Sequence, residues 1–174
     1  ILNAGISFIS LLDTDVVAVY NYFSVGGLFG VTAKSLIIPA ALIFLSLGAA
    51  LLLSPKISLL CLGDSLASSL GVRVRLLRMV CLICASASAA AVVSFAGLLG
   101  FVGLIVPHIA RKLSGGGMTK TLVLASMVGA TVVMLADTLG RTLFAPTEIP
   151  VGIVMALTGA PFFLVLLLRR REHA

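Results

Sequence analysis

Long apolar runs without charged residues dominate this sequence and decide what the chain can fold into. Four runs, residues 36–53, 79–96, 121–136 and 151–168, approach the ~20 apolar residues that a helix needs to cross a lipid bilayer. Charged residues make up only 10% of the chain, whereas a typical soluble domain has about 25%. The sequence therefore predicts an all-α, polytopic transmembrane helical bundle.

The N-terminal part of the chain is only partly apolar. Residues 1–12 are expected to be the end of a further helix, and residues 13–35 an external segment. Tyr20 and Tyr22 within that segment favour the membrane–water boundary, so we expect an interfacial or re-entrant helix there. Because the chain begins inside an apolar run and without Met, we expect it to be a fragment of a longer chain.

A fifth apolar segment, residues 101–113, has Pro107 at its centre. At ~1.5 Å per residue it is too short to cross a ~30 Å hydrocarbon core alone. If it crosses, ten of the twelve Lys and Arg residues lie on one side, and only Lys34 and Arg141 on the other. If it does not, the split is seven to five. Lys and Arg gather on the cytoplasmic side, so we expect this segment to cross, with the basic side and the C-terminus cytoplasmic.

A short helix next to irregular backbone is tolerated at membrane depth only where protein or a water-filled cavity surrounds it. Such helices often line a transport path. A packing irregularity away from any path explains residues 101–113 equally well.

Residues 57–78, on the basic side, are too numerous for a simple turn. Asp64 is expected to cap a short helix, and Gly71 to end it in a left-handed conformation, before a second short helix leads into the next span. This pair would protrude from the membrane. The spacing alone favours a surface loop with topology-setting arginines over a docking element for a partner.

His108 follows Pro107 in the short segment. A histidine inside a membrane can relay protons or bind a ligand, but no second metal ligand lies at a suitable spacing. We therefore expect a hydrogen-bonded, structural histidine.

Polar residues on the outer side allow two interpretations. Asp137 and Arg141 stand four residues apart, the spacing of a helical ion pair. An arginine at an outer helix end can also bind a carboxylate of a partner protein. Glu148 lies near the start of the last helix, where it complements the helix dipole.

The sequence contains no catalytic constellation, such as a Ser/His/Asp set, a carboxylate pair or a phosphate-binding loop. We therefore expect a non-enzymatic chain without a cofactor or metal of its own. The net charge of +6 reflects membrane orientation, and we expect no nucleic-acid partner.

Three motifs carry a family resemblance: GLLGFVGLIVPHIARKL, LADTLGR and PTEIPVGIVMALTGAPFFLVLLLRR. In order and spacing they resemble the C-terminal half of FecCD-type permeases, the membrane subunits of bacterial ABC importers for iron–siderophore complexes, haem and cobalamin. LGDSLASSLGV resembles the cytoplasmic segment that precedes these motifs in the family. The resemblance covers about residues 60–171.

This resemblance implies a type II permease of ten helices in the bacterial inner membrane, of which this fragment holds the end of the fifth helix and helices six to ten. The implied partners are an ATP-binding subunit that holds ATP and Mg²⁺, an extracytoplasmic substrate-binding protein, a second permease copy and membrane lipid. The alternative is a fragment of an ion-coupled secondary transporter with His108 and Asp137 as its coupling groups.

The resemblance also implies roles for individual residues. The coupling segment that contacts the ATPase would include Gly63, Asp64, Ala67, Leu70 and Gly71, and Arg141 would dock the binding protein. Residues 114–120 replace a polar turn that family members often carry, and Lys120 would keep its positive charge. The architectural signature comprises Gly103, Pro107, His108, Arg111, Asp137, Glu148, Pro150, Gly159 and Pro161.

Overall fold

The computed structural model describes residues 14–28, 30–143 and 149–171. Seven helices and no strand lie in these residues, which confirms the all-α prediction. The helices are α2 (Thr14–Val25), α3 (Ala33–Leu60), α4 (Asp64–Ser69), α5 (Val74–Ala96), α6 (Val102–Ser114), α7 (Met118–Thr142) and α8 (Val151–Arg171). Residues 1–12, expected to end a further helix, lie outside the described residues.

Three helices, α3, α5 and α7, are long and apolar enough to cross a membrane, and Val151–Leu164 of α8 is a shorter apolar helix. Each of the three extends beyond the apolar run that predicted it. Backbone hydrogen bonding continues through polar residues, so a helix does not end where its apolar run ends. Lys56 thus lies inside α3, and Lys120 inside α7.

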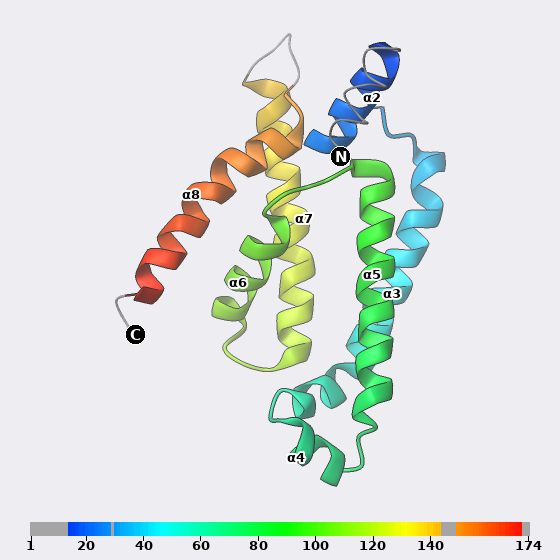
Figure 1. The fold of residues 1–174 in the computed structure, drawn as a ribbon, viewed down its shortest axis with the longest axis vertical. Coiled ribbons are helices and arrows are strands. Elements are labelled where there is room, and N and C mark those ends of the chain that lie inside the picture. The colour runs from blue at the N-terminus through cyan, green and yellow to red at the C-terminus, as the bar shows by residue number, and fades with distance from the viewer. Residues whose placement is uncertain (1–13, 29, 144–148, 172–174) are drawn as a thin grey trace, which may run out of the picture.

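The long helices run in alternating directions (Figure 1). Helix α3 descends to α4, α5 returns beside α3, α6 descends, α7 ascends and α8 descends again. We call the end that carries α4 and the α6–α7 link the α4 end, and the opposite end, with α2, the α2 end. Helix α6 runs opposite to both α5 and α7. That this short segment crosses a membrane stays a prediction.

The chain directions also separate the charges. Lys34 starts α3 and Arg141 ends α7, so both lie toward the α2 end. The other ten basic residues lie on segments at or directed toward the α4 end: Lys56, Arg73, Arg75, Arg78, Arg111, Lys112, Lys120, Arg169, Arg170 and Arg171. Ten basic residues thus lie toward one end of the bundle and two toward the other. Which side of a membrane each end faces stays a prediction.

The buried core is small and lies between α6, α7 and α8. Ile105, Ala136, Val151 and Met155 form it. Many large apolar side chains remain exposed on the long helices; Leu52, for example, is 84% exposed. So much exposed apolar surface is rare on soluble monomers and fits contact with lipid or with further protein.

Backbone contacts join three segments at the α2 end. Gly27 donates to the Ala96 carbonyl at 2.9 Å, and Gly152 donates to the Gly26 carbonyl at 3.0 Å. A Cβ atom on Gly97 would lie 2.5 Å from the Phe23 carbonyl oxygen. Glycine therefore allows the end of α2, the end of α5 and the start of α8 to meet backbone to backbone.

Candidate functional site

Helix α4 protrudes beyond the ends of the long helices (Figure 1). It lies in residues 57–78, the segment predicted to couple to an ATPase. Gly63 is its N-cap, with φ of 118°, and makes no side-chain capping bond. The expectation that Asp64 caps this helix is therefore wrong, since Asp64 is already its first helical residue.

Asp64 pairs with an arginine of the next helix instead. The Nη2 atom of Arg78 lies 2.7 Å from Oδ1 and 2.8 Å from Oδ2 of Asp64. The two side chains are 57% and 54% exposed, so solvent screening limits this pair to about 0.2–1 kcal/mol of stability. Its main effect is geometric, because it ties the start of α4 to the second turn of α5.

Gly71 ends this short excursion in the predicted left-handed conformation, with φ of 81°. Its N–H donates to the Ser68 carbonyl at 3.0 Å, and the Val72 N–H donates to the Ala67 carbonyl at 3.0 Å. These two bonds form a Schellman motif, which satisfies the last carbonyls of a helix. The exit from α4 is thus fixed by hydrogen bonds.

The second short helix predicted after Gly71 is absent from the described residues. Val74 begins α5, which continues unbroken to Ala96. No glycine or proline lies between these residues to interrupt the helix. The basic stretch that was assigned to a separate helix forms the first turns of α5.

The side chains of α4 divide into a packed face and an open face. Ala67 is fully buried, whereas Leu66 and Leu70 are 48% and 59% exposed. A larger residue at Ala67 would separate α4 from the segments it packs on. Leu66 lies on α4 and Leu70 is its C-cap. Because α4 projects beyond the long apolar helices, these exposed leucines form a candidate contact surface for another protein.

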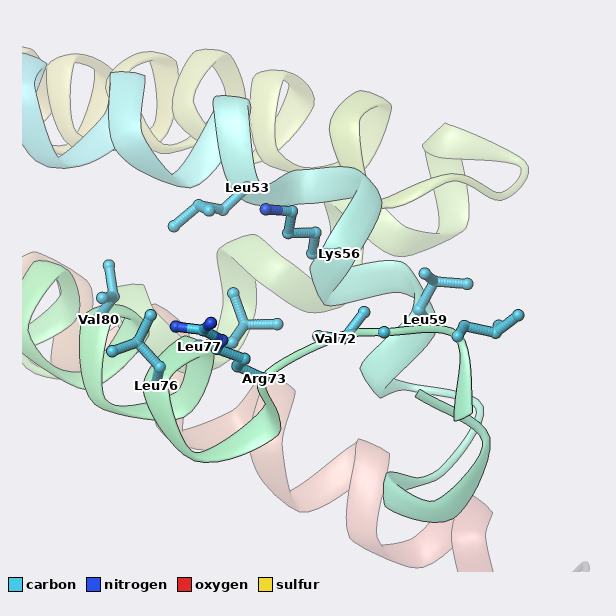
Figure 2. Close-up of a pocket in the computed structure, with 10 residues that line it drawn as sticks. Leu53, Lys56, Leu59, Val72, Arg73, Leu76, Leu77 and Val80 are labelled. Atoms are coloured by element: carbon cyan, nitrogen blue, oxygen red, sulfur yellow. The ribbon is translucent and has the colours of Figure 1, made fainter. Parts of the chain in front are cut away.

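A pocket of about 380 Å³ lies between the last turns of α3, the α4–α5 link and the first turns of α5 (Figure 2). We call it the α3–α5 pocket. Lys56 and Arg73 supply two positive charges to walls that are otherwise mostly apolar. The lining residues are Leu53, Lys56, Leu59, Leu70, Gly71, Val72, Arg73, Leu76, Leu77 and Val80.

The signature residues of α6 pack locally. The ring of His108 stands edge-on to Phe162 of α8, with centroids 6.1 Å apart and an interplanar angle of 75°. Within the described residues His108 makes no hydrogen bond, so the expected polar contact is replaced by an aromatic one. Arg111 donates from Nε to the Pro107 carbonyl at 3.3 Å. Gly103 has open space where a Cβ would lie.

Asp137 and Arg141 form the predicted ion pair in the last turns of α7. Arg141 Nε lies 2.9 Å from Asp137 Oδ2, and the two side chains are 42% and 26% exposed. Arg141 is therefore positioned by its own helix and reachable from outside. Pro150 directly precedes α8, whereas Glu148 lies outside the described residues.

Gly159 and Pro161 lie inside α8. A Cβ on Gly159 would overlap the Phe101 side chain, reaching within 2.6 Å of Cγ. Phe101 caps the start of α6 in a left-handed conformation, with φ of 63°. The absence of a side chain at Gly159 thus lets α8 lie against the start of α6, while the side of α8 at Pro161 is exposed.

Sequence reasoning missed a polar link between α3 and α7. Ser54 is 1% exposed, and its hydroxyl donates to the Leu51 carbonyl at 2.8 Å. Leu51 lacks its usual helical partner because Pro55 has no N–H. The Thr119 hydroxyl lies 2.6 Å from the Ser54 hydroxyl and must be the donor, since Ser54 has only one hydrogen to give. A serine before a proline within an apolar helix is the signal that could have revealed Ser54.

No group of three or more His, Cys, Asp or Glu residues that could hold a metal ion occurs in the described part of the chain. An all-helical membrane protein, with a short projecting helix at its basic end, is the class that this fold and site define.

Comparison with known proteins assigns the family within this class. The chain belongs to the FecCD transport family, whose model matches residues 1–169. The structure also resembles one chain of a solved metal-chelate type ABC transporter in an inward-facing conformation, with a TM-score of 0.80 and 32% sequence identity. The match covers 87% of this chain and 50% of that chain.

Curated relatives are permeases of iron and haem transport systems. The Fe(3+)-citrate import system permease protein YfmE of Bacillus subtilis (strain 168) is 45% identical over 116 residues, which cover 67% of this chain and 35% of that protein. The hemin transport system permease protein HmuU of Yersinia pestis is 38% identical over 154 residues, which cover 88% of this chain and 46% of that protein. The chain thus spans about a third to a half of these relatives' length.

Proposed function

We propose that this chain is part of the membrane-spanning permease subunit of an ATP-driven importer for metal chelates of the iron–siderophore, haem or cobalamin type. The observation that carries the proposal is α4, a braced helix with exposed leucines at the basic end of a FecCD family member. The relatives' transport of iron citrate and hemin supports the substrate class. In this proposal the α4 end faces the cytoplasm of a bacterial inner membrane, as the excess of Lys and Arg there favours.

Helix α4 would contact the ATP-binding subunit, which binds ATP and Mg²⁺. The Asp64–Arg78 pair connects one end of α4 to α5, and the Schellman motif at Gly71 fixes the other end. A displacement of α4 by the ATPase would therefore be transmitted to α5, because no flexible loop separates the two helices. Transport would follow as the paired permeases open alternately to the two sides.

Arg141 would contact an acidic side chain of a substrate-binding protein at the opposite, outer end. The ion pair with Asp137 holds the guanidinium at an exposed position at the end of α7. Bidentate binding of a carboxylate suits arginine better than lysine. A second permease copy would complete the transport path.

The ion-coupled alternative has less support. His108 packs against Phe162, and Asp137 is paired with Arg141 near a helix end. With these contacts, neither side chain is placed to bind and release a proton or a sodium ion in the middle of the membrane. Membership of the FecCD family favours the ATP-driven importer.

The test uses the full-length permease reconstituted with its ATPase and binding protein. We expect Gly71→Ala combined with Asp64→Asn to reduce the stimulation of ATP hydrolysis by loaded binding protein by roughly ten-fold or more, because both ends of α4 lose their anchors. Lys34→Gln, at the opposite end, is the matched control. Unchanged stimulation in a correctly assembled α4 variant would contradict the proposal.

A further inference from the structure

Two cations in the α3–α5 pocket have no acidic partner in the described part of the chain. Lys56 lies in α3, and Arg73 in the link before α5. The ion pairs found there are Arg78 with Asp64 and Arg141 with Asp137. The nearby carboxylate of Asp64 is thus used by Arg78, and the pocket carries a net positive charge.

The two charged groups address the same space. Figure 2 shows the Lys56 amine and the Arg73 guanidinium on facing walls, both directed back along the helices toward Leu53 and Leu77. The pocket volume of about 380 Å³ lies within the range of about 300–1,000 Å³ that is usual for small-molecule sites. An anion between these walls would be held by both cations at once.

Beyond the cations the pocket becomes apolar and follows helices that can cross a membrane. Leu53 lies in α3 and Val80 in α5, and both helices are long and apolar enough to span a bilayer. Leu76, one turn before Val80 on α5, is 58% exposed. An occupant that combines an anionic group with a hydrocarbon chain would match both the cations and the apolar walls.

We propose that the α3–α5 pocket binds an anionic phospholipid, with the headgroup phosphate between Lys56 and Arg73 and an acyl chain along Leu53, Leu76 and Val80. Basic pockets between transmembrane helices on the cytoplasmic side are suited to anionic headgroups. An acidic side chain of a protein partner could pair with the cations, but it would leave the apolar walls uncovered.

The inference rests on the proposed orientation, with the α4 end in the cytoplasm, and on no step of transport. It has a consequence for α4, because Leu70 and Gly71 also line the pocket. A bound lipid would fill the space between α3 and the link that follows α4, and would restrict the movement of α4 toward α3. Lipid composition would thus tune how firmly α4 is held.

The test measures retained phosphatidylglycerol by native mass spectrometry on the full-length permease assembled with its ATPase subunit. The pocket variant is Lys56→Gln with Arg73→Gln, and the control is Lys34→Gln with Arg75→Gln. Both variants lose two positive charges, but neither control residue lines the pocket. We expect phosphatidylglycerol binding to weaken roughly 30-fold in the pocket variant alone, at roughly five-fold per basic residue near an anionic lipid.

The exchange Lys56→Arg with Arg73→Lys keeps both charges and should restore binding, which separates charge from misfolding. Phosphatidylcholine, which carries the same phosphate but no net charge, should not compete. Equal phosphatidylglycerol retention in pocket and control variants would overturn the proposal. Loss of the ATPase subunit with unchanged lipid would overturn it in favour of a protein carboxylate. Lipid retention is read without transport, so this result stands apart from the coupling test above.

Discussion

The two ends of the bundle are held together in different ways. At the α2 end, Gly97 and Gly152 bring backbone against backbone, and Gly152 donates directly to the Gly26 carbonyl. At the α4 end, segments are joined by side chains, notably Asp64 with Arg78 and Ser54 with Thr119. A backbone junction offers few alternative arrangements, whereas an exposed ion pair such as Asp64 with Arg78 can break and re-form at a cost of only about 0.2–1 kcal/mol. The α4 end is therefore the end suited to movement.

The two ends also differ in the space around their glycines. A Cβ atom would meet backbone at Gly97 and Gly152 but nothing within 4 Å at Gly71 or Gly115. Gly97 and Gly152 need glycine for close approach, and Gly97 also has a positive φ of 68°. Gly71 and Gly115 need glycine for positive φ alone. Substitution should consequently unsettle helix packing at the α2 end and only a local turn at the α4 end.

The largest effect is expected for Gly152→Ala. The added Cβ would overlap the Val25 carbonyl oxygen, and neither backbone can retreat without disturbing α2 or α8. We expect a loss at or above the upper end of about 1–3 kcal/mol, measured as a lower melting temperature of the full-length permease in detergent. Gly48→Ala, where nothing lies within 4 Å, should leave it unchanged or slightly raised. Equal melting of both variants would remove the distinction between the ends.

Gly71→Ala should cost less and act locally. A non-glycine residue in the left-handed conformation costs about 1–2 kcal/mol. Hydrogen exchange of α4 should accelerate while the melting temperature hardly changes. Gly71→Asn should retain more protection, because asparagine tolerates this conformation. Global unfolding by Gly71→Ala would show that α4 is part of the rigid core.

Ser54→Ala should cost about 0.5–1.5 kcal/mol, because it removes a buried hydrogen bond between α3 and α7. Thr119→Val should cost a similar amount, and the double variant little more than either, since both changes break the same bond. Ser86→Ala, whose hydroxyl bonds only its own helix, is the control. Fully additive costs would contradict the link.

Asp64→Asn should have the smallest effect on stability, about 0.2–1 kcal/mol. The cost should shrink as salt concentration rises, because the pair is exposed and screened. A double-mutant cycle with Arg78→Gln, read by hydrogen exchange of α4, measures the coupling. A coupling of zero at low salt would show that this pair does not orient α4.

The sequence predicted the helices because apolar runs of membrane length leave few alternatives. It underestimated their ends, since hydrogen bonding continues past the last apolar residue, as at Lys56. The second short helix was wrong for the same reason: nothing interrupts α5 after Val74. The Asp137–Arg141 ion pair could be predicted, because residues four apart lie close together on a helix.

Contacts between distant segments could not be predicted. Arg78 meets Asp64 only because α4 folds back beside α5. Gly159 must be small only because the unusual backbone of Phe101 places a ring against it. The α3–α5 pocket likewise depends on how two helices and a link are placed around Lys56 and Arg73. Each depends on tertiary geometry that no spacing rule encodes.

Site-specific cross-linking tests most directly whether α4 receives the ATPase. A photoreactive residue replaces Ser68, which is exposed on α4, or Lys34 at the α2 end, in the full-length permease with its ATPase and binding protein. We expect the probe at position 68 to cross-link to the ATPase subunit, with a yield that changes on ATP binding, and the probe at position 34 never to do so. An ATPase cross-link from position 34, or none from position 68 in an assembled, active complex, would contradict the proposal that α4 contacts the ATPase.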